Sequence, residues 1–477
     1  MKRTFKAHPL MILKFVKPFL FVLLLPVIKG ALQYLTNKTI DGVLGLEIFL
    51  FLCLTAIGIL RWQSFSLICN EQTRTVTIKS GFLFKRTAKI NIAKLSSVQT
   101  TKSPLDTIFR SVTYKINTEA GNSRKSDFEF KLSVKNSKIV SDLLYGKGEP
   151  KAVKFSFLKI AVLAATTSSA ATGILIGVPI INRAGNLLGI GLSDMLLNEI
   201  NNLSLKVKTY FPPVVNAISL VILFSFLISF LYSFFKYINF RLYLEKDKME
   251  VRSGFIIRAR TSFRKSAVNN IKVEQTVLMM LLKRFAMKVS VGGYGDVKSE
   301  SQVIIPLGRN KEIKNRLSEY FPFFLSTEKG IHPNRSNLTK SRFLFWPAIY
   351  FIGVSLLAIW SSQRFEDLTR FILFLTAVLC SVVVCYAYVC LFEYNKGRVA
   401  FGDSVFARSN RGLRTYELYC PKENIGEIKL IRFPTDYLYK TCRIKISVRS
   451  ENADSIRVRH LDYQKVKDEV YKCFNIE

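Results

Sequence analysis

Histidine is scarce in this sequence, and the short motifs that mark common enzyme sites are missing. The three histidines, His8, His332 and His460, have no second ligand at metal-binding spacing. No Gly-x-Ser-x-Gly, phosphate-binding loop or His-Glu-x-x-His motif occurs. The sequence therefore predicts no catalytic residues, no metal site and no cofactor, and it favours a protein that is not an enzyme.

Cysteine pairing signals are also missing. The eight cysteines form no CxxC pair and show no metal-ligand spacing. Cys380, Cys385 and Cys390 are five residues apart, so a helix rotates each about 140° from the last and they share no face. We interpret these three cysteines as ordinary packing residues, and we expect no disulfides among the four cysteines of the β-rich blocks.

Acidic residues are half as common as basic ones, with 34 Asp and Glu against 70 Lys and Arg, and the formal net charge is +36. Apolar residues make up 49% of the chain. They concentrate in runs near the roughly 20 residues that a membrane-spanning helix requires. These runs predict six transmembrane helices in three pairs, at residues 15–35, 44–60, 157–181, 214–235, 343–360 and 371–392.

The charge distribution predicts the orientation of these helices. The three loops that join the members of each pair carry a net charge of only about +1, so nearly all the positive charge lies on the other side. Lys and Arg concentrate on the cytoplasmic side of membrane proteins. We therefore expect a multi-pass protein of the bacterial inner membrane, with both termini in the cytoplasm. The first apolar run is too long for a typical cleaved signal peptide, and we interpret it as a retained span.

A unit of two apolar runs followed by a basic, β-rich block occurs three times. The Ser-Gly-Phe triplet at 80–82 recurs at 253–255, an offset of 173 residues. The stretch 271–291 matches 428–448 without a gap, at an offset of 157. Self-similarity on this scale indicates one structural unit copied three times.

Each block reads as short strands closed by one helix. Val76 and Ile78 alternate with polar residues, which is the period of a half-buried strand. In the first block the only helical stretch is 134–145, and the corresponding stretches are 313–321 and 463–474. The fold class is therefore membrane α-helical plus β, with each helix pair followed by a small sandwich or barrel that has a C-terminal helix.

These residues resemble a known family. Residues 80–87, 90–98 and 103–105, with their second copies at 252–258 and 268–273, are similar to the bacterial pleckstrin-homology-like (PH-like) domain of YdbT-type membrane proteins. The third copy departs from the pattern at 401–404. The resemblance implies a fold and a membrane location, and it implies no catalytic residues. The predicted divisions are helix pair 1 at 1–60, domain 1 at 61–150, helix pair 2 with an outer amphipathic loop at 151–239, domain 2 at 240–327, a linker with helix pair 3 at 328–392, and domain 3 at 393–477.

A basic cluster follows the first turn of each block. One reading is contact with an anionic lipid surface, where each Lys or Arg near the membrane contributes roughly 1 kcal/mol. The other reading is a solvated face that reflects the positive-inside bias, and nucleic acid binding is not expected. The candidate contacts are Lys85, Arg86 and Lys89 in the first block, Arg258, Arg260 and Arg264 in the second, and Arg408 and Arg411 in the third.

Two charged residues lie inside the first pair of apolar runs. Lys29 and Glu47 are near the outer ends of antiparallel spans, so they could form an intramembrane charge pair. Snorkelling to the interface is the alternative. The glycine-rich stretch 292–296 reads as a hairpin turn, with a ligand loop as the alternative.

Two functional hypotheses follow. The first is a non-enzymatic scaffold whose cytoplasmic PH-like domains bind partner proteins, each other as a homo-oligomer, or lipid headgroups at the inner leaflet. The second is a transport or export component that removes a toxic compound or lipid from the membrane. The few ionisable groups in the spans count against the second hypothesis.

Overall fold

The computed structural model describes residues 2–13, 42–81, 84–118, 127–145, 152–169, 213–245, 247–291, 302–309, 330–449 and 455–474, with residues 195, 198, 199, 202 and 321. The chain divides into two compact units. The first holds Met1–Ala152, Tyr243–Ala267 and Gly292–Ser299, and the second holds Val153–Leu242, Val268–Val291 and Glu300–Glu477. The division therefore passes through the second repeat.

Repeat 1 is a β-sandwich closed by a helix. Its elements are β1 (Lys2–Lys6), α2 (Gly42–Gln63), β2 (Ser66–Asn70), β3 (Thr75–Ser80), β4 (Arg86–Asn91), β5 (Leu95–Lys102), α3 (Pro104–Ile108), β6 (Ser111–Thr118), β7 (Phe128–Ser133) and α4 (Val134–Tyr145). Alternate residues of both layers, such as Leu67 and Tyr114, fill one core with Val140 and Leu144 of α4. The Tyr114 hydroxyl donates to the Ser137 carbonyl at 2.9 Å, so its polar end is satisfied inside this core.

The first strand of repeat 1 comes before its helix pair. β1 pairs antiparallel with β2 along its length, from Lys2 opposite Asn70 to Lys6 opposite Ser66. The chain between them is therefore inserted between two neighbouring strands of one sheet. Trp62, at the end of α2, donates its indole N–H to the Ala7 carbonyl at 2.7 Å and holds the helix end against β1. The predicted domain boundary at residue 61 leaves this strand out.

Repeat 2 has the same element order. Its elements are β8 (Ala152–Lys154), α5 (Phe157–Thr167), α8 (Pro213–Tyr237), β9 (Arg241–Leu244), β10 (Lys248–Ser253), β11 (Arg258–Arg264), β12 (Val268–Thr276), α9 (Val277–Leu281), β13 (Arg284–Val291) and β14 (Gln302–Arg309). Gly254 turns the chain between β10 and β11 with φ near +101°, and a Cβ there would lie 2.0 Å from the Ile257 carbonyl oxygen. Only glycine fits this turn without strain.

Repeat 3 completes the series. Its elements are α11 (Asn337–Arg364), α12 (Thr369–Lys396), β15 (Arg398–Ala400), β16 (Ser404–Arg411), β17 (Arg414–Pro421), β18 (Ile425–Ile431), α13 (Pro434–Leu438), β19 (Thr441–Val448), β20 (Ser455–Asp462) and α14 (Tyr463–Phe474). Both layers and α14 share one core, which includes Val405, Ile444 and Val466. Ile331 pairs with Val399 in an antiparallel bridge, so this helix pair also leaves from and returns to neighbouring strands.

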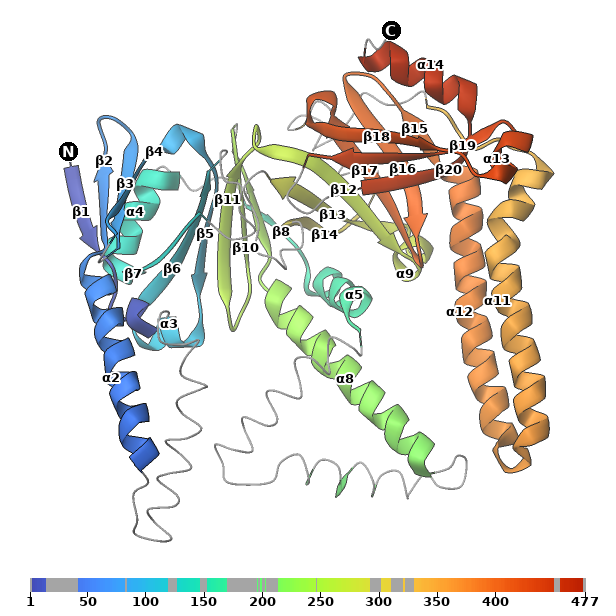
Figure 1. Ribbon diagram of the computed structural model, residues 1–477, viewed down its shortest axis with the longest axis horizontal. Helices are drawn as coiled ribbons and strands as arrows, with labels where there is room; N and C mark the ends of the chain where they lie inside the picture. Colours follow the sequence, from blue (N-terminus) through green and yellow to red (C-terminus); the bar gives the residue numbers. More distant parts are fainter. Residues whose placement is uncertain are drawn as a thin grey trace. The chain divides into compact units, whose positions relative to one another are not determined.

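Neighbouring repeats share sheets. In the first unit, β11 of repeat 2 pairs antiparallel with β5 of repeat 1, and we name this ladder the first joint (Figure 1). In the second unit, β17 of repeat 3 pairs antiparallel with β12 of repeat 2, which is the second joint. The sheet orders are β7-β6-β5-β11-β10-β9-β8 and β14-β13-β12-β17-β16-β15.

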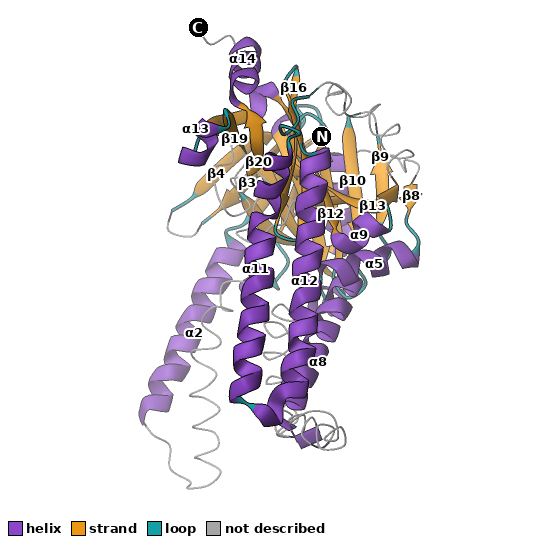
Figure 2. Ribbon diagram, turned by 90° about the vertical axis from the view of Figure 1, so that its right-hand side faces the viewer, coloured by secondary structure: helices purple, strands orange, loops and turns teal. Residues whose placement is uncertain are grey.

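Three helices in the described part of the chain are long and apolar enough to cross a membrane: Ser219–Tyr237 of α8, and all of α11 and α12. α11 and α12 run side by side as a hairpin (Figure 2). They match the predicted spans at 214–235, 343–360 and 371–392. Residues 15–35 lie outside the described residues, 44–60 fall in α2, and 157–181 are described only as far as 169. Six spans therefore remain a prediction.

The predicted repeat is confirmed in detail. The offsets of 173 and 157 carry β6 onto β13 and β19, and α3 onto α9 and α13. The closing helices predicted at 134–145 and 463–474 match α4 and α14. The prediction of a single helix in the first block was wrong, because α3 is a second one. The helix predicted at 313–321 lies outside the described residues except for residue 321.

Candidate membrane-contact site

Each repeat carries a five-residue helix between the first two strands of its second layer. These helices are α3, α9 and α13, and each is capped at its start. The Ser103 hydroxyl accepts from the Asp106 N–H at 3.2 Å, while the Asp106 carboxylate accepts from the Ser103 N–H at 3.1 Å. In repeat 2 the Thr276 hydroxyl accepts from the Met279 N–H at 3.4 Å. These caps satisfy the amides that a helix start leaves free, so the short helices hold their shape.

The helices and the residues that flank them expose large apolar side chains. The exposed fraction reaches 71% at Ile108 and 79% at Leu438. Contiguous exposed apolar groups mark contacts with proteins or membranes rather than ordinary surface. The full set is Leu105, Ile108 and Phe109 in repeat 1, Leu278, Leu281 and Leu282 in repeat 2, and Phe433, Tyr437, Leu438 and Tyr439 in repeat 3.

A basic residue with left-handed backbone ends each of these segments. Arg110, Lys283 and Lys440 have φ of +52°, +51° and +50°. This conformation costs a residue with a Cβ roughly 1–2 kcal/mol. The Arg110 carbonyl accepts from the Val134 N–H at 3.0 Å, which fixes the turn into the next strand. The same left-handed, exposed cation follows an apolar tip in all three copies, at the position where helices commonly end in this conformation.

The joints bring a second apolar turn beside each of the first two helices. In the first joint Arg258 lies opposite Lys102, so the turn before Arg258 lies beside the start of α3. That turn exposes Phe255, Ile256 and Ile257. Figure 1 shows α3 and the β10–β11 turn at the end of the first unit from which α2 extends.

The second joint repeats this arrangement. Arg414 lies opposite Thr276, the N-cap of α9, so the exposed side chain of Leu413 lies beside this helix. Each joint therefore gathers apolar side chains from two repeats and flanks them with cations.

α3 and α13 lie where an apolar helix meets its sandwich. Arg342, near the start of α11, forms an ion pair with Asp436 of α13 and stacks 5.1 Å from the Tyr439 ring centre. His8, just before the helical turn at 11–13, donates its backbone N–H to the Lys131 carbonyl at 2.8 Å and hydrogen-bonds the Phe109 backbone through its ring. Burial lowers the pKa of His8, and Lys131 adds to this effect.

Three of the eight predicted basic contacts are held inside the fold. The Arg260 guanidinium donates to Glu250 at 2.8 Å, and Arg264 donates to the Ile92 carbonyl at 2.6 Å across the first joint. Arg408 forms an ion pair with Glu417. These contacts leave the three side chains poorly placed to meet lipid.

The other five are exposed. Lys85, Arg86 and Lys89 lie on or just before β4, and Arg258 and Arg411 lie next to turns. Of these, Arg258 borders the apolar turn at 255–257, and Arg411 lies in the turn that holds Leu413. Sequence reasoning missed Arg110 and its two counterparts, although Lys283 and Lys440 fall at the repeat offset of 157.

The remaining sequence candidates fall outside the described part of the chain. Lys29 lies in the 14–41 gap, and only the backbone of Glu47 is described. The glycine-rich stretch 292–296 and most of the outer amphipathic loop also lie in undescribed segments.

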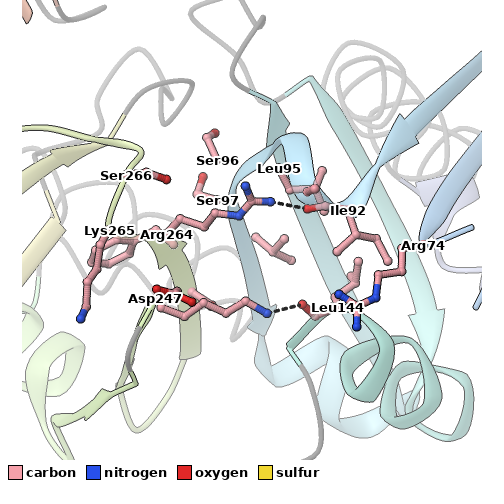
Figure 3. A pocket seen from close by; sticks show the side chains of 15 residues that line it. Arg74, Ile92, Leu95, Ser96, Ser97, Leu144, Asp247, Arg264, Lys265 and Ser266 are labelled. Carbon is pink, nitrogen blue, oxygen red and sulfur yellow. Dashed lines mark hydrogen bonds between the residues drawn. The ribbon is translucent and has the colours of Figure 1, made fainter. Parts of the chain in front are cut away.

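A cleft of about 440 Å³ lies at the end of the first joint that is far from α3 (Figure 3). Its cations are Arg74, Lys248, Arg264 and Lys265, against the single carboxylate of Asp247. Arg264 and Lys248 point across it and donate to the Ile92 and Leu144 carbonyls, at 2.6 and 3.4 Å. Burial lowers the pKa of Lys265, which Asp247 partly opposes. The hydrogen bonds of Arg264 and Lys248 therefore link repeat 2 to repeat 1 at this end of the first joint.

Within the described residues, no three His, Cys, Asp or Glu side chains gather as a metal ion requires.

The bacterial PH domain family matches residues 18–147 and 193–320, the first two repeats. Among curated proteins, none matches the chain. The two matched regions cover a little over half of the chain and contain most of the described strands of repeats 1 and 2. The chain therefore belongs to the bacterial PH domain family.

Proposed function

We propose that this chain is a non-enzymatic, multi-pass protein of the bacterial inner membrane whose PH-like repeats form an interaction module on the cytoplasmic leaflet. The observation that carries this proposal is the turn that recurs at α3, α9 and α13. In each repeat an exposed apolar tip ends in a left-handed cation. This pairing suits the boundary between anionic headgroups and acyl chains, where apolar burial and attraction to negative charge act together.

The helices support this placement. α11 meets the apolar-tipped side of repeat 3 through the ion pair of Arg342 with Asp436, so the lipid boundary would pass close to α13. α2, α5 and the apolar run predicted at 15–35 would complete six spans. In that arrangement the repeats rest on the leaflet from which their own helices enter the membrane.

The joints supply the second part of the proposal. Because β11 and β17 add to the sheets of the preceding repeats, the PH-like domains of this chain bind one another through main-chain hydrogen bonds. Domains joined in this way would hold partner proteins close to the membrane. This is the behaviour expected of a scaffold rather than of a transporter.

The test measures how deeply α3 enters the lipid. The full-length protein carrying Ile108→Cys, labelled with an environment-sensitive fluorophore, is placed in nanodiscs of phosphatidylcholine with a quarter phosphatidylglycerol. We expect a blue-shifted emission and quenching by nitroxide-labelled lipids. Lys138→Cys, on the exposed face of α4, is the matched control and should show neither effect. The unaltered protein gives the background from native cysteines. Equal quenching at the two positions would contradict the membrane-contact proposal.

A further inference from the structure

The two joints leave one strand of the joint-forming type unpaired on its outer side in the first repeat and one in the third. β4 is the edge strand of the sheet β1-β2-β3-β4, and β18 is the edge strand of the sheet β18-β19-β20. No described strand pairs with the outer side of either one. Open edges present a row of unpaired backbone N–H and C=O groups to other chains.

These two edges are counterparts of the strands that form the joints. By the repeat offsets, β4 corresponds to β11 and β17, and β18 corresponds to β5 and β12. Every joint therefore pairs one strand of the β4 type with one strand of the β18 type, taken from neighbouring repeats. The chain ends with one unused strand of each type.

The two joints also use the same register. Thr101 lies opposite Ala259 in the first joint, and the offsets carry this pair onto Glu274 opposite Tyr416, which are partners in the second joint. The correspondence holds for each pair from residue 98 to residue 102. One geometry has therefore been kept in two ladders with different side chains.

We propose that β4 of one copy pairs antiparallel with β18 of a second copy, so that molecules of this protein assemble head to tail through a third joint. The proposal deepens the function proposed above, in which the PH-like domains bind one another. The offsets also define the register of the third joint. It places Ile431 opposite Arg86, Leu430 opposite Thr87, Lys429 opposite Ala88, and Ile428 opposite Lys89.

The side chains of β18 are less buried than those of its counterpart β12, as expected if β18 lacks a partner strand. Ile428 and Leu430 are half-buried, whereas their counterparts in β12, Ile271 and Val273, are 0% and 4% exposed. No residue of β18 is buried, and five of the nine residues of β12 are. A neighbouring sheet would complete the burial of these apolar side chains.

The proposed third joint would place two positive side chains opposite each other, as the first joint does. Lys85 would lie opposite Arg432 in this register, and the corresponding residues Arg258 and Lys102 face each other in the first joint. The same-sign pair is therefore tolerated in a formed ladder. It makes the contact between copies weaker than the tethered joints, since linked domains associate at a high effective concentration.

The geometry of the assembly follows from the two different edges. A contact between unlike surfaces is heterologous, so copies add in a row until a ring closes. Anchoring in one membrane restricts this addition to two dimensions.

Cysteine cross-linking between differently tagged copies tests the register. One copy carries Ala88→Cys and the other Lys429→Cys, and both are oxidised in native membranes. We expect a disulfide that joins the two tags, because these side chains would face each other. In the control the second copy carries Leu430→Cys, which places the thiol on the opposite face of the sheet. A third pair without introduced cysteines gives the background. Absence of the mixed-tag product, or equal yields with both partners, would overturn the proposal.

Charge changes at the same pair give a second measurement. Ala88→Asp should raise copurification of the two tags roughly two- to five-fold and Ala88→Lys should lower it, because each faces Lys429. Unchanged copurification in both variants would also overturn the third joint. The fluorophore on α3 reads membrane contact independently. Normal quenching there without cross-linking would refute the assembly and leave the proposed function in place.

Discussion

Asp106 and Asp436 occupy the same position in repeats 1 and 3, where each caps a short helix and is almost fully buried. Burial by itself would raise the pKa of Asp106, but hydrogen bonds from Lys131, Ser111 and Ser103 lower it to about 2. Lys131 lies 2.5 Å from the carboxylate. In repeat 2 the position is Met279, so the short helix there has no carboxylate in its cap.

We predict that Asp106→Asn lowers the free energy of unfolding by about 2 kcal/mol at pH 7, since the shifted pKa measures the extra stability of the charged form. The pKa is lower in the folded chain than in the unfolded one. The contribution is therefore fully present above about pH 5 and is lost as the pH falls towards 2. Thermal unfolding in detergent between pH 7 and pH 3 measures this.

The matched control is Asp142→Asn, which removes an exposed carboxylate from α4. It should change stability by less than about 0.5 kcal/mol. A variant at Asp106 with wild-type stability at pH 7 would mean that Lys131 finds another partner.

At the scale of elements, a buried ion pair fixes the end of α12 to repeat 3. Glu393 is 1% exposed, and Arg459 of β20 donates to its carboxylate at 2.5 Å. The Ser409 hydroxyl of β16 adds a bond of 2.8 Å. The last turn of the helix is therefore joined to both layers of the sandwich, and a movement of the helix would be transmitted to the domain.

We predict that Arg459→Ala lowers the free energy of unfolding by about 3 kcal/mol, because it leaves a buried carboxylate without its partner. Arg457→Ala, two residues away on the exposed side of the same strand, is the control and should be close to neutral. Thermal melting of both variants in detergent measures the difference. Equal melting temperatures for the two variants would show that Glu393 is neutralised in another way.

Element positions follow from local patterns in most cases. The closing helices at 134–145 and 463–474 were predicted correctly, because an amphipathic repeat over three turns is a local signal. β1, with the sequence Lys-Arg-Thr-Phe-Lys, was not predicted. Only Phe5 of this strand is buried, and its partner strand lies about 60 residues later, so no local signal marks it.

The candidate site was only partly predictable for a similar reason. Charge clusters are visible in a sequence, but the carboxylate that neutralises a cation is not. Arg260 and Arg408 face Glu250 and Glu417 on adjacent strands, and this depends on strand register. Arg110 looks like any surface arginine until its backbone conformation is known.

At the scale of the whole molecule, the membrane orientation is the main expectation. We predict that Glu366→Cys, in the turn between α11 and α12, reacts with an impermeant maleimide added outside intact cells. Lys138→Cys on α4 should react only after the cells are opened. Both positions are exposed and lie outside the joints. Labelling in the reverse pattern would invert the proposed topology, and the unaltered protein supplies the background from native cysteines.

The sequence by itself determined the units of this protein. It contains the three copies, the apolar runs, the glycine at the first turn of the first two copies and the closing helices, since periodicity and turn chemistry act over a few residues. Only the tertiary structure decided how those units combine. A strand that can complete its own sandwich or extend a neighbouring sheet has the same alternating pattern in both cases. The choice of β5 as the partner of β11, and of β12 as the partner of β17, depends on which edges the folded chain brings together.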